Sequence, residues 1–274
     1  MESYFFNNYY KDSGMHFYKF QANGNDFILV DDRQGFFIEQ TKKIARLCHR
    51  HFGIGADGLI LLKDSADSDF DMRYFNSDGK PAAMCGNGGR CIAALAFMKN
   101  IAGKKMLFSA TDGIHEAQIE NVSSDQKVFD VSLKMQDVEG AKVFDDGWFL
   151  NTGVPHFVRF VSDVKRLDVK LLGRKIRNDD RFLLQGTNVN FVEIQKGRLF
   201  VRTYERGVED ETLSCGTGVT ASALAAFVKT GKSPSEIITP GGTFSVRFQK
   251  VKNGFNHVWL RGPAQWVFEG EMAF

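Results

Sequence analysis

Two cysteines, Cys85 and Cys215, begin nearly the same short motif at two places in the chain. Glycine follows each cysteine at the next position and again at the third, giving Cys-Gly-Asn-Gly and Cys-Gly-Thr-Gly. A thiolate can act as a base, a nucleophile or a metal ligand, and its pKa can fall at a helix N-terminus. Glycines would leave the amide groups of such a loop open to a carboxylate. The motif therefore predicts thiol chemistry beside a bound anion.

The two motifs belong to a longer internal repeat, because Cys215 lies 130 positions after Cys85 (215 − 85 = 130). Residues 84–99 read MCGNGGRCIAALAFMK, and residues 214–229 read SCGTGVTASALAAFVK. A single Cys-Gly-x-Gly is more often a buried cysteine at a tight turn. The same three residues in two copies whose other residues differ favour a functional role.

Each motif lies between a predicted strand and a predicted helix. Residues 70–76 and 199–205 read as strands, and the Ala-rich segments after the cysteines have high helix propensity. Further strands are predicted at residues 26–31, 59–62, 157–161, 188–194 and 243–248, and another helix at residues 41–51.

This order of elements predicts an α+β fold made of two similar domains, each a curved, mainly antiparallel sheet around a long central helix. We expect an N-terminal extension at residues 1–14, a first domain at 15–135 with Cys85, and a second at 136–274 with Cys215. The last strand could return to the first domain. A cleft between two facing domains would receive one cysteine from each.

Composition excludes several classes of protein. The 274 residues include 35 basic and 33 acidic side chains without a basic cluster, so no nucleic-acid partner is expected. There is no apolar stretch of ~20 residues and no signal-peptide pattern, which predicts a cytoplasmic protein without membrane contact. Four cysteines are too few for a disulfide framework and suit a reducing compartment.

Metal and nucleotide sites are the main rival interpretations of the cysteines and glycines. Cys85, Cys91 and His115 lack the close ligand pairs of structural zinc sites. Neither glycine-rich phosphate motif, Gly-x-x-x-x-Gly-Lys-Ser/Thr or Gly-x-Gly-x-x-Gly after a strand, is present. No metal and no cofactor are therefore predicted, and Cys48 and Cys91 are interpreted as core residues.

From residue 15 onward the chain strongly resembles the diaminopimelate epimerase family, whose members interconvert LL- and meso-diaminopimelate without a cofactor. The motifs that carry this resemblance identify the family in combination, although each alone would be weak evidence. They are Gly24-Asn25-Asp26-Phe27, Asn76-Ser77-Asp78-Gly79, Cys85-Gly86-Asn87-Gly88-Gly89-Arg90-Cys91, Pro155-His156, Asn188-Val189-Asn190-Phe191, Glu205-Arg206-Gly207 and Cys215-Gly216-Thr217-Gly218.

The resemblance implies that Cys85 and Cys215 lie on opposite faces of the α-carbon of a small amino-acid substrate. One thiolate would remove the α-proton and the opposite thiol would return one, which inverts the centre. His156 would lie near these cysteines and tune proton transfer. The growing negative charge would be stabilised by backbone amides at the two helix starts, namely those of Gly86, Asn87, Gly216 and Thr217.

Recognition of the distal end of diaminopimelate is assigned by the same resemblance. Arg206 would bind the distal carboxylate and Glu205 would lie near the distal ammonium. Glu205 is also expected among the catalytic residues, with the two cysteines and His156. Asn25, Asn76 and Asn188 would form hydrogen bonds with the substrate. Asn76 and Arg206 are themselves 130 residues apart.

Two residues depart from the family pattern. Family members often have Gln where Gly58 stands and Asn where Val154 stands, and both would be substrate contacts. Neighbours such as Thr152, or water, could replace those contacts, or the substrate range could differ. A homodimer is expected, although Phe268 stands where the family often has a contact tyrosine.

Two alternatives to the epimerase stay open from the residues alone. One is a proline- or hydroxyproline-type racemase or isomerase of the same fold, although a substrate with one charged end has no use for both Glu205 and Arg206. The other is a non-catalytic amino-acid binding or redox-sensing protein in which Cys85 and Cys215 form a reversible disulfide.

Overall fold

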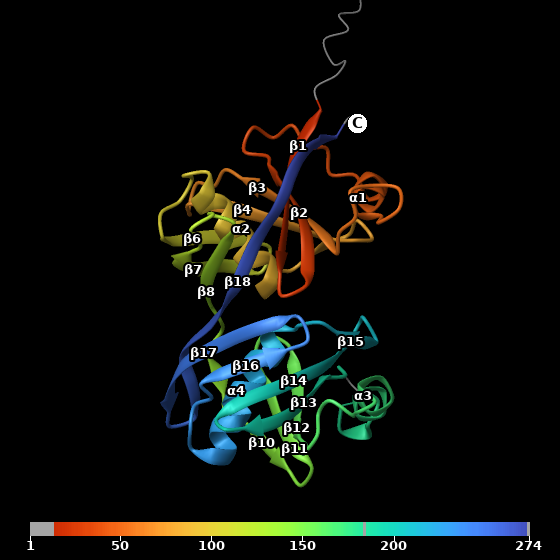
Figure 1. Cartoon of the computed structure of the whole chain (residues 1–274), viewed down its shortest axis with the longest axis vertical. Coiled ribbons are helices and arrows are strands. Elements are labelled where there is room, and N and C mark those ends of the chain that lie inside the picture. Colours follow the sequence, from red (N-terminus) through yellow and green to blue (C-terminus); the bar gives the residue numbers. More distant parts are fainter. Residues whose placement is uncertain (1–13, 183–184, 273–274) are drawn as a thin grey trace, which may run out of the picture.

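The computed structural model describes residues 14–182 and 185–272, so all of the predicted extension at residues 1–14 except Gly14 lies outside the described part. Figure 1 shows two bodies of strands, the first half of the chain above the second, each with a long helix inside. The predicted α+β class with two similar halves is confirmed. No helix among the described residues is long and apolar enough to cross a bilayer.

The first half contains eight strands and two helices up to residue 134. They are β1 (Met15–Ala22), β2 (Asn25–Asp31), α1 (Thr41–Cys48), β3 (Gly58–Lys63), β4 (Phe70–Asn76), β5 (Pro81–Ala82), α2 (Gly86–Met98), β6 (Lys105–Ala110), β7 (Gly113–Val122) and β8 (Val128–Lys134).

The second half begins with short strands and ends with a very long one. Its elements are β9 (Val138–Glu139), β10 (Lys142–Phe144), β11 (Gly147–Asn151), β12 (Pro155–Phe160), α3 (Val169–Arg177), the 3-10 helix η1 (Asp180–Phe182), β13 (Asn188–Gln195), β14 (Arg198–Glu205), β15 (Asp210–Thr212), α4 (Gly216–Thr230), β16 (Glu236–Thr239), β17 (Gly242–Val251) and β18 (Gly254–Met272).

Strands of the first half pair in the order β1–β2–β3–β4–β6–β7–β8, and β18 pairs with both β1 and β8. This closes a ring around α2. Only the β2–β3 and β4–β6 pairs are parallel. All residues of α2 from 87 to 96 are buried, as expected for a helix that is apolar on every side.

The second half repeats this arrangement around α4. Its strands pair in the order β10–β11–β12–β13–β14–β16–β17–β18, with parallel pairs at β12–β13 and β14–β16. The offset of 130 residues holds across the elements. It relates the first residues of β2 and β12, of β3 and β13, and of α2 and α4.

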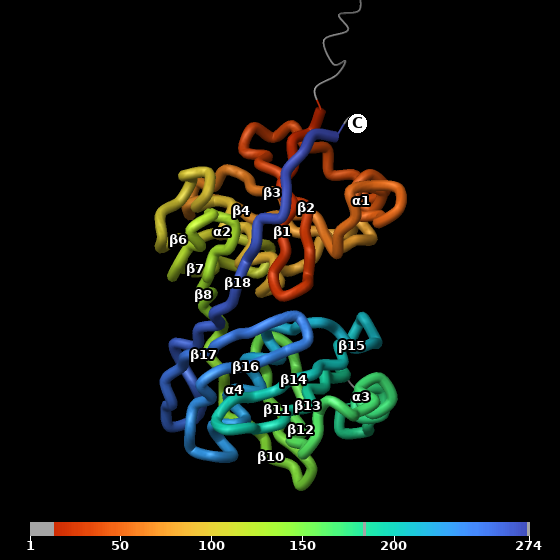
Figure 2. Tube along the Cα trace, viewed as in Figure 1, coloured from red at the N-terminus to blue at the C-terminus, as the bar shows by residue number. Residues whose placement is uncertain are grey.

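Strand β18 runs through both bodies. Its first part pairs with β17 and β9, its middle with β8, and its last part with β1 from Met15 to Gln21. Figure 2 shows this blue segment leaving the lower body and passing up along the red strands of the upper one. The two bodies are therefore joined by a continuous strand as well as by the segment after β8.

Helix α1 is shorter than predicted, because it ends at Cys48 and not near His51. The His49 ring accepts hydrogen bonds at Nδ1 from the backbone N–H groups of His51 (3.1 Å) and Phe52 (3.3 Å). A side chain that satisfies backbone donors in this way competes with further helical turns.

Candidate active site

The two helix starts meet at the junction of the halves. A Cβ atom built on Gly216 would lie 4.0 Å from the Cα atom of Gly86, and the Asn87 side chain lies 3.4 Å from the Ser214 hydroxyl. That Cβ would also come within 2.8 Å of Leu260 Cδ2 on β18, so a larger residue at position 216 would require the leucine side chain to move. The segments that carry Cys85 and Cys215 therefore lie together.

The two thiols are half-buried and each lies at the N-cap of its helix. Cys85 Sγ accepts a hydrogen bond from the Gly88 amide (3.2 Å), whereas Cys215 Sγ lies 3.4 Å from the Thr217 hydroxyl. Burial raises the pKa of both thiols. This is opposite to the effect expected of a helix start, because the amides offset only part of the cost of removing a thiolate from water.

The other two cysteines lie in the cores. Cys91 lies on α2 in the core of the first body, and Cys48 is the last residue of α1 and packs into a second core cluster. Burial raises the pKa of Cys48 to about 12, so this thiol stays protonated. Within residues 14–182 and 185–272, no group of three or more His, Cys, Asp and Glu side chains could hold a metal ion.

Both helix starts present backbone N–H groups that the fold leaves unpaired. In the described part of the chain, the amides of Gly86, Gly216 and Thr217 donate no hydrogen bond to protein. The Asn87 amide lies close enough to Cys85 to lower the pKa of that thiol. Free amides at two converging helix starts suit a carboxylate.

A buried chain of polar side chains leads from the second sheet to Cys215. Asn190 Nδ2 donates to His156 Nδ1 (3.0 Å), which leaves the His156 proton on Nε2, 2.9 Å from the Thr217 hydroxyl oxygen. The Thr217 hydroxyl can then donate to Cys215 Sγ. The His156 pKa falls to about 3, through burial and then the charge of Arg206, so the imidazole is neutral.

Asn190 was not selected in the sequence analysis, although it follows Asn188 by two positions in a strand. Residues two apart in a strand face the same side, so this alternation could have identified it. Thr203 on β14 donates to Asn190 Oδ1 (2.9 Å) and so orients the amide. Glycine at 218 allows this approach, because a Cβ there would lie 2.3 Å from Asn190 Oδ1.

Glu205 lies at the end of β14 and faces Cys215. The Thr212 hydroxyl donates to Glu205 Oε1 (2.5 Å), and burial raises the Glu205 pKa. Its carboxylate charge and a hydrogen bond with the thiol add to the burial that raises the Cys215 pKa. Glu205 is therefore a partner of the Cys215 thiol.

Arg206 follows Glu205 and is held by its neighbours in a half-buried position. Its backbone N–H donates to Asn188 Oδ1 (2.9 Å), and its Nη1 donates to the carbonyl of Gln185 (2.5 Å). No carboxylate pairs with Arg206 among the described residues. Asn188 is thus used to fix the backbone at Arg206, while the guanidinium keeps donors for an anion.

Asn25 and Asn87 connect the first sheet to the start of α2. Asn87 Nδ2 donates to Asn25 Oδ1 (3.2 Å), and Asn25 Nδ2 donates to Asp57 Oδ2 (2.8 Å). Arg50 pairs with Asp57 (2.8 Å) and completes the chain. Asp57 and Arg50, which the sequence analysis did not select, therefore orient the Asn25 amide.

Asn76 and Gly58 are paired residues of β4 and β3. Asn76 is exposed, and its backbone bonds Lys80 and Gly79 in the turn that follows. A Cβ on Gly58 would lie 2.6 Å from both the Phe75 carbonyl oxygen and Cε2 of the Tyr74 ring. The tyrosine thus fills the space that a longer residue at position 58 would need.

The second departure from the family pattern, Val154, lies in the turn between β11 and β12. The neighbouring Thr152 donates its hydroxyl proton to the Thr217 carbonyl at the start of α4 (3.0 Å). Thr152 therefore supports the helix start and has only lone pairs left to offer a substrate.

A hollow of about 530 Å³ lies between the halves and reaches both helix starts. Its lining includes Met84, Gly86, Gln136, Val154 and Thr217. This agrees with a site formed by both halves.

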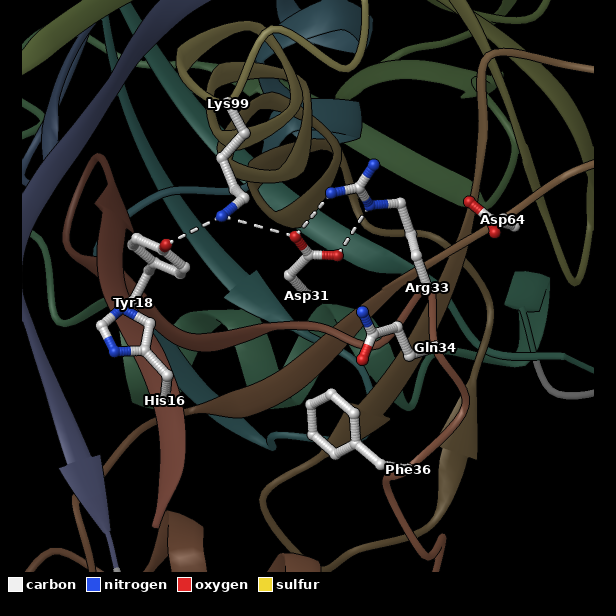
Figure 3. A pocket seen from close by; sticks show the side chains of 8 residues that line it. All are labelled: His16, Tyr18, Asp31, Arg33, Gln34, Phe36, Asp64 and Lys99. Carbon is white, nitrogen blue, oxygen red and sulfur yellow. Dashed lines mark hydrogen bonds and ion pairs between the residues drawn. The ribbon is translucent and has the colours of Figure 1, made fainter. Parts of the chain in front are cut away.

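Another hollow, of about 440 Å³, lies beside the C-terminal end of α2. Its lining residues differ from those proposed for catalysis. Figure 3 shows Lys99 and Arg33 turned toward Asp31. Lys99 Nζ lies 3.1 Å from Tyr18 Oη and 3.4 Å from Asp31 Oδ2, and Arg33 pairs with Asp31 at 2.8 Å. Its Lys99 and Arg33 side chains are already paired with Asp31, and no residue of either helix start lines it.

Comparison with known proteins assigns the family. The family model described as diaminopimelate epimerase matches residues 17–136 and 148–267, one match in each half. Diaminopimelate epimerase of Flavobacterium psychrophilum is 48% identical over 260 residues, covering 93% of this chain and 99% of that protein. The diaminopimelate epimerase of Aquifex aeolicus is 41% identical, covering 94% and 98%.

Solved structures share the fold at low sequence identity. A PhzF-family phenazine biosynthesis protein of Bacillus anthracis superposes with a TM-score of 0.70 at 14% identity, covering 96% of this chain and 100% of that one. A hydroxyproline epimerase of Agrobacterium vitis superposes with a TM-score of 0.61 at 13% identity, covering 95% and 92%. The fold is thus shared by proteins with several activities, whereas the two relatives at 48% and 41% identity are both diaminopimelate epimerases. The chain belongs to the diaminopimelate epimerase family.

Proposed function

We propose that the protein interconverts LL- and meso-diaminopimelate by a two-base reaction in which Cys85 and Cys215 are the acid and the base. The observation that carries this proposal is the pair of thiols at two helix starts that meet at the junction of the halves. Family membership at 48% identity supports the substrate.

The reaction moves one proton at each step. One thiolate takes the α-hydrogen as a proton, and the electron pair of the C–H bond stays on carbon and spreads into the carboxylate. The opposite thiol then gives its proton to the other face of that carbon and becomes a thiolate. The centre is inverted, and the two sulfur atoms have exchanged protonation states, ready for the reverse reaction.

Stabilisation of the carbanion is the largest requirement, because an amino-acid α-hydrogen is a weak acid. The unpaired amides of Gly86, Gly216 and Thr217, with that of Asn87, are suited to hold the reacting carboxylate as its charge grows. His156 would act through Thr217, whose hydroxyl it bonds, and not as a base in its own right.

The distal carboxylate of the substrate would bind Arg206, whose guanidinium has no carboxylate partner in the described chain. Asn25, Asn76 and Asn188 would line or support the same site. Glu205 would serve Cys215 directly and could reach the distal ammonium only from there. A proline-type racemase would leave the Arg206 cation unused, so this alternative is disfavoured.

Several features of the working protein follow from the same proposal. The chemistry needs two reduced thiols, and the four cysteines are free, which supports a cytoplasmic enzyme. The two-thiol reaction as proposed uses no cofactor, and its product would feed lysine biosynthesis. Val267 and Phe268 expose 48% and 46% of their surface on β18, which supports a homodimer through this strand. The domains would divide near residues 135–136.

Epimerisation can be tested by incubating the reduced protein with LL-diaminopimelate in deuterated water and following inversion and α-deuteration by NMR. Both should occur. Cys85→Ala and Cys215→Ala should each lower the rate of inversion by at least about 10³-fold, because either change removes one of the two proton carriers.

Cys48→Ala is the matched control, since that thiol is buried in a core cluster at the end of α1, and it should keep nearly the wild-type rate. Full activity of either Ala variant at 85 or 215 would rule out the two-thiol mechanism. Absence of both inversion and deuteration in the wild type would rule out the epimerase itself.

A further inference from the structure

We propose that Arg90 is a positioning residue that holds the start of α2 against the domain junction and favours the thiolate form of Cys85. The inference deepens the proposed function, since it concerns one of the two proposed acid–base groups. It rests on the burial of the Arg90 side chain, its hydrogen bonds and its place in the repeat.

Arg90 is fully buried, and its guanidinium bonds the first turn of its own helix. Nη2 donates to Asn87 Oδ1 (2.8 Å), and Nη1 donates to the Gly86 carbonyl (3.3 Å). These two residues carry amides proposed to hold the reacting carboxylate. A change at Arg90 would therefore move the anion-binding loop without touching the substrate.

The same guanidinium reaches the junction of the halves. Nη2 also donates to Asn23 Oδ1 in the β1–β2 turn (2.9 Å), and Nε contacts the Pro263 carbonyl on β18 (3.5 Å). Its carbon lies 5.0 Å from the centre of the Phe244 ring on β17. Arg90 thus ties the helix start to strands of both bodies.

Arg90 has no carboxylate ion-pair partner among the described residues, which is unusual for a buried cation. Burial lowers its pKa only to about 10, so it stays charged at neutral pH. Asp130 contributes a favourable charge but is itself paired with Arg261. The nearby group that can supply a negative charge when needed is Cys85.

The other titratable groups near Cys85 do not take over this role. Burial raises the pKa values of Cys91 and Tyr74, which keeps both neutral. The Glu205 carboxylate opposes ionisation of Cys85, and Arg90 is the cation whose charge favours it. Beside burial and the Gly88 amide, the charged groups that act on Cys85 are therefore Arg90, which favours the thiolate, and Glu205, which opposes it.

The repeat provides a natural control, because Thr220 stands 130 residues after Arg90. The Thr220 hydroxyl donates to the Gly216 carbonyl (3.0 Å), the bond equivalent to that between Arg90 and the Gly86 carbonyl. The bond is thus retained in both halves while the positive charge is present only beside Cys85. We infer that the positive charge of Arg90, and not only its hydrogen bond to the Gly86 carbonyl, favours the thiolate form of Cys85.

The test is the pH dependence of alkylation by iodoacetamide, measured for each cysteine by peptide mass spectrometry on the full chain. In the wild type, Cys85 should reach half-maximal reactivity at a lower pH than Cys215. Arg90→Gln should shift the Cys85 midpoint up by about 1 pH unit or more, and Arg90→Lys should restore most of it. The Cys215 midpoint should move by less than about 0.3 pH units.

Thr220→Val is the matched variant, and it should leave the Cys85 midpoint unchanged. Circular dichroism and thermal melting should accompany each variant. Folded Arg90→Gln protein with an unshifted Cys85 midpoint would overturn the proposal. If the Arg90 variants do not fold, the wild type still tests the proposal. Half-maximal alkylation of Cys215 at a lower pH than that of Cys85 would overturn it as well. Alkylation does not depend on turnover, so either result is separable from failure of the epimerase assay.

Discussion

The two halves of the molecule share a backbone plan but differ in the layer beneath their helix starts. Under α2, a Cβ on Gly88 would meet Ile60 Cδ1 at 3.0 Å, whereas under α4 the equivalent Gly218 faces Asn190, 130 residues after Ile60. Asn190 bonds His156, whose equivalent in the first half is Asp26, paired with Lys19 at 2.7 Å. One thiol therefore rests on an apolar layer and the other on a polar chain.

The charges around the thiols differ in the same way. Cys85 has the Arg90 cation on its own helix, and Cys215 has the Glu205 carboxylate on the neighbouring strand. The residues at the equivalent positions, Thr220 and Phe75, are uncharged. A duplicated frame thus places two chemically identical groups in unequal electrostatic surroundings, which suits a reaction in which one must hold a proton while the other lacks it.

The largest difference expected between the halves is at the equivalent pair Asn76 and Arg206. Arg206→Met should lower kcat/KM for diaminopimelate by about 10²–10³-fold, because it removes a charged partner of the distal carboxylate. Asn76→Ala should lower it by only about tenfold or less, the value of one neutral hydrogen bond. Steady-state kinetics in both directions measure this, and equal losses would contradict the assignment of the distal site to Arg206.

The two third-position glycines should differ in their effect on stability. Gly218→Ala should lower the free energy of unfolding by about 2–3 kcal/mol, because its Cβ would lie 2.3 Å from Asn190 Oδ1 and displace the amide from His156 and Thr203. In Gly88→Ala the Cβ would come within 3.0 Å of Ile60 Cδ1 and 3.3 Å of Met72 Cε and Cys85 Sγ, a milder crowding of which the helix propensity of Ala offsets about 1 kcal/mol. Urea unfolding compares them. A larger loss of unfolding free energy for Gly88→Ala than for Gly218→Ala would mean that Asn190 can shift away from its partners at little cost.

The polar chain under α4 should also make the second half sensitive to acid. His156 has a pKa of about 3 in the folded protein, so between pH 6.5 and 3 the unfolded chain binds a proton that the folded one excludes. Stability is therefore lost as the pH falls. The wild type should lose about 2 kcal/mol more than His156→Gln between pH 7 and pH 5. Urea unfolding of both proteins at the two pH values measures this, and parallel losses would show that His156 is protonated in the fold.

The sequence predicted the parts of the fold that depend on local pattern. The predicted strand at 70–76 matches β4, and the helices begin directly after Cys85 and Cys215 because a Gly-rich start precedes an Ala-rich run. The repeat offset predicted two similar halves. The proposed site residues that the structure groups near the helix starts came from motifs that are continuous in the chain.

Residues that act through a long-range contact were not predictable in this way. Arg90 and Asp57 are ordinary charged residues until the fold places Asn23 and Asn25 beside them. The thiol pKa values also depend on burial, and that of Cys85 depends on the charge of Glu205 in the opposite half, which a local helix-start argument does not include. Gly58 is explained only by Tyr74 on the neighbouring strand, a pairing that register decides.

Strand β18 has a consequence for synthesis of the chain on the ribosome. The ring around α2 contains residues from the first half, yet it closes only when residues 262–272 pair with β1 and β8. During translation, the edge of β1 that pairs with β18 therefore stays unpaired until nearly the entire second half has been made. The Cys85 half would reach its final form only after the Cys215 half has been made, so an interrupted chain would carry the first thiol in an unfinished body.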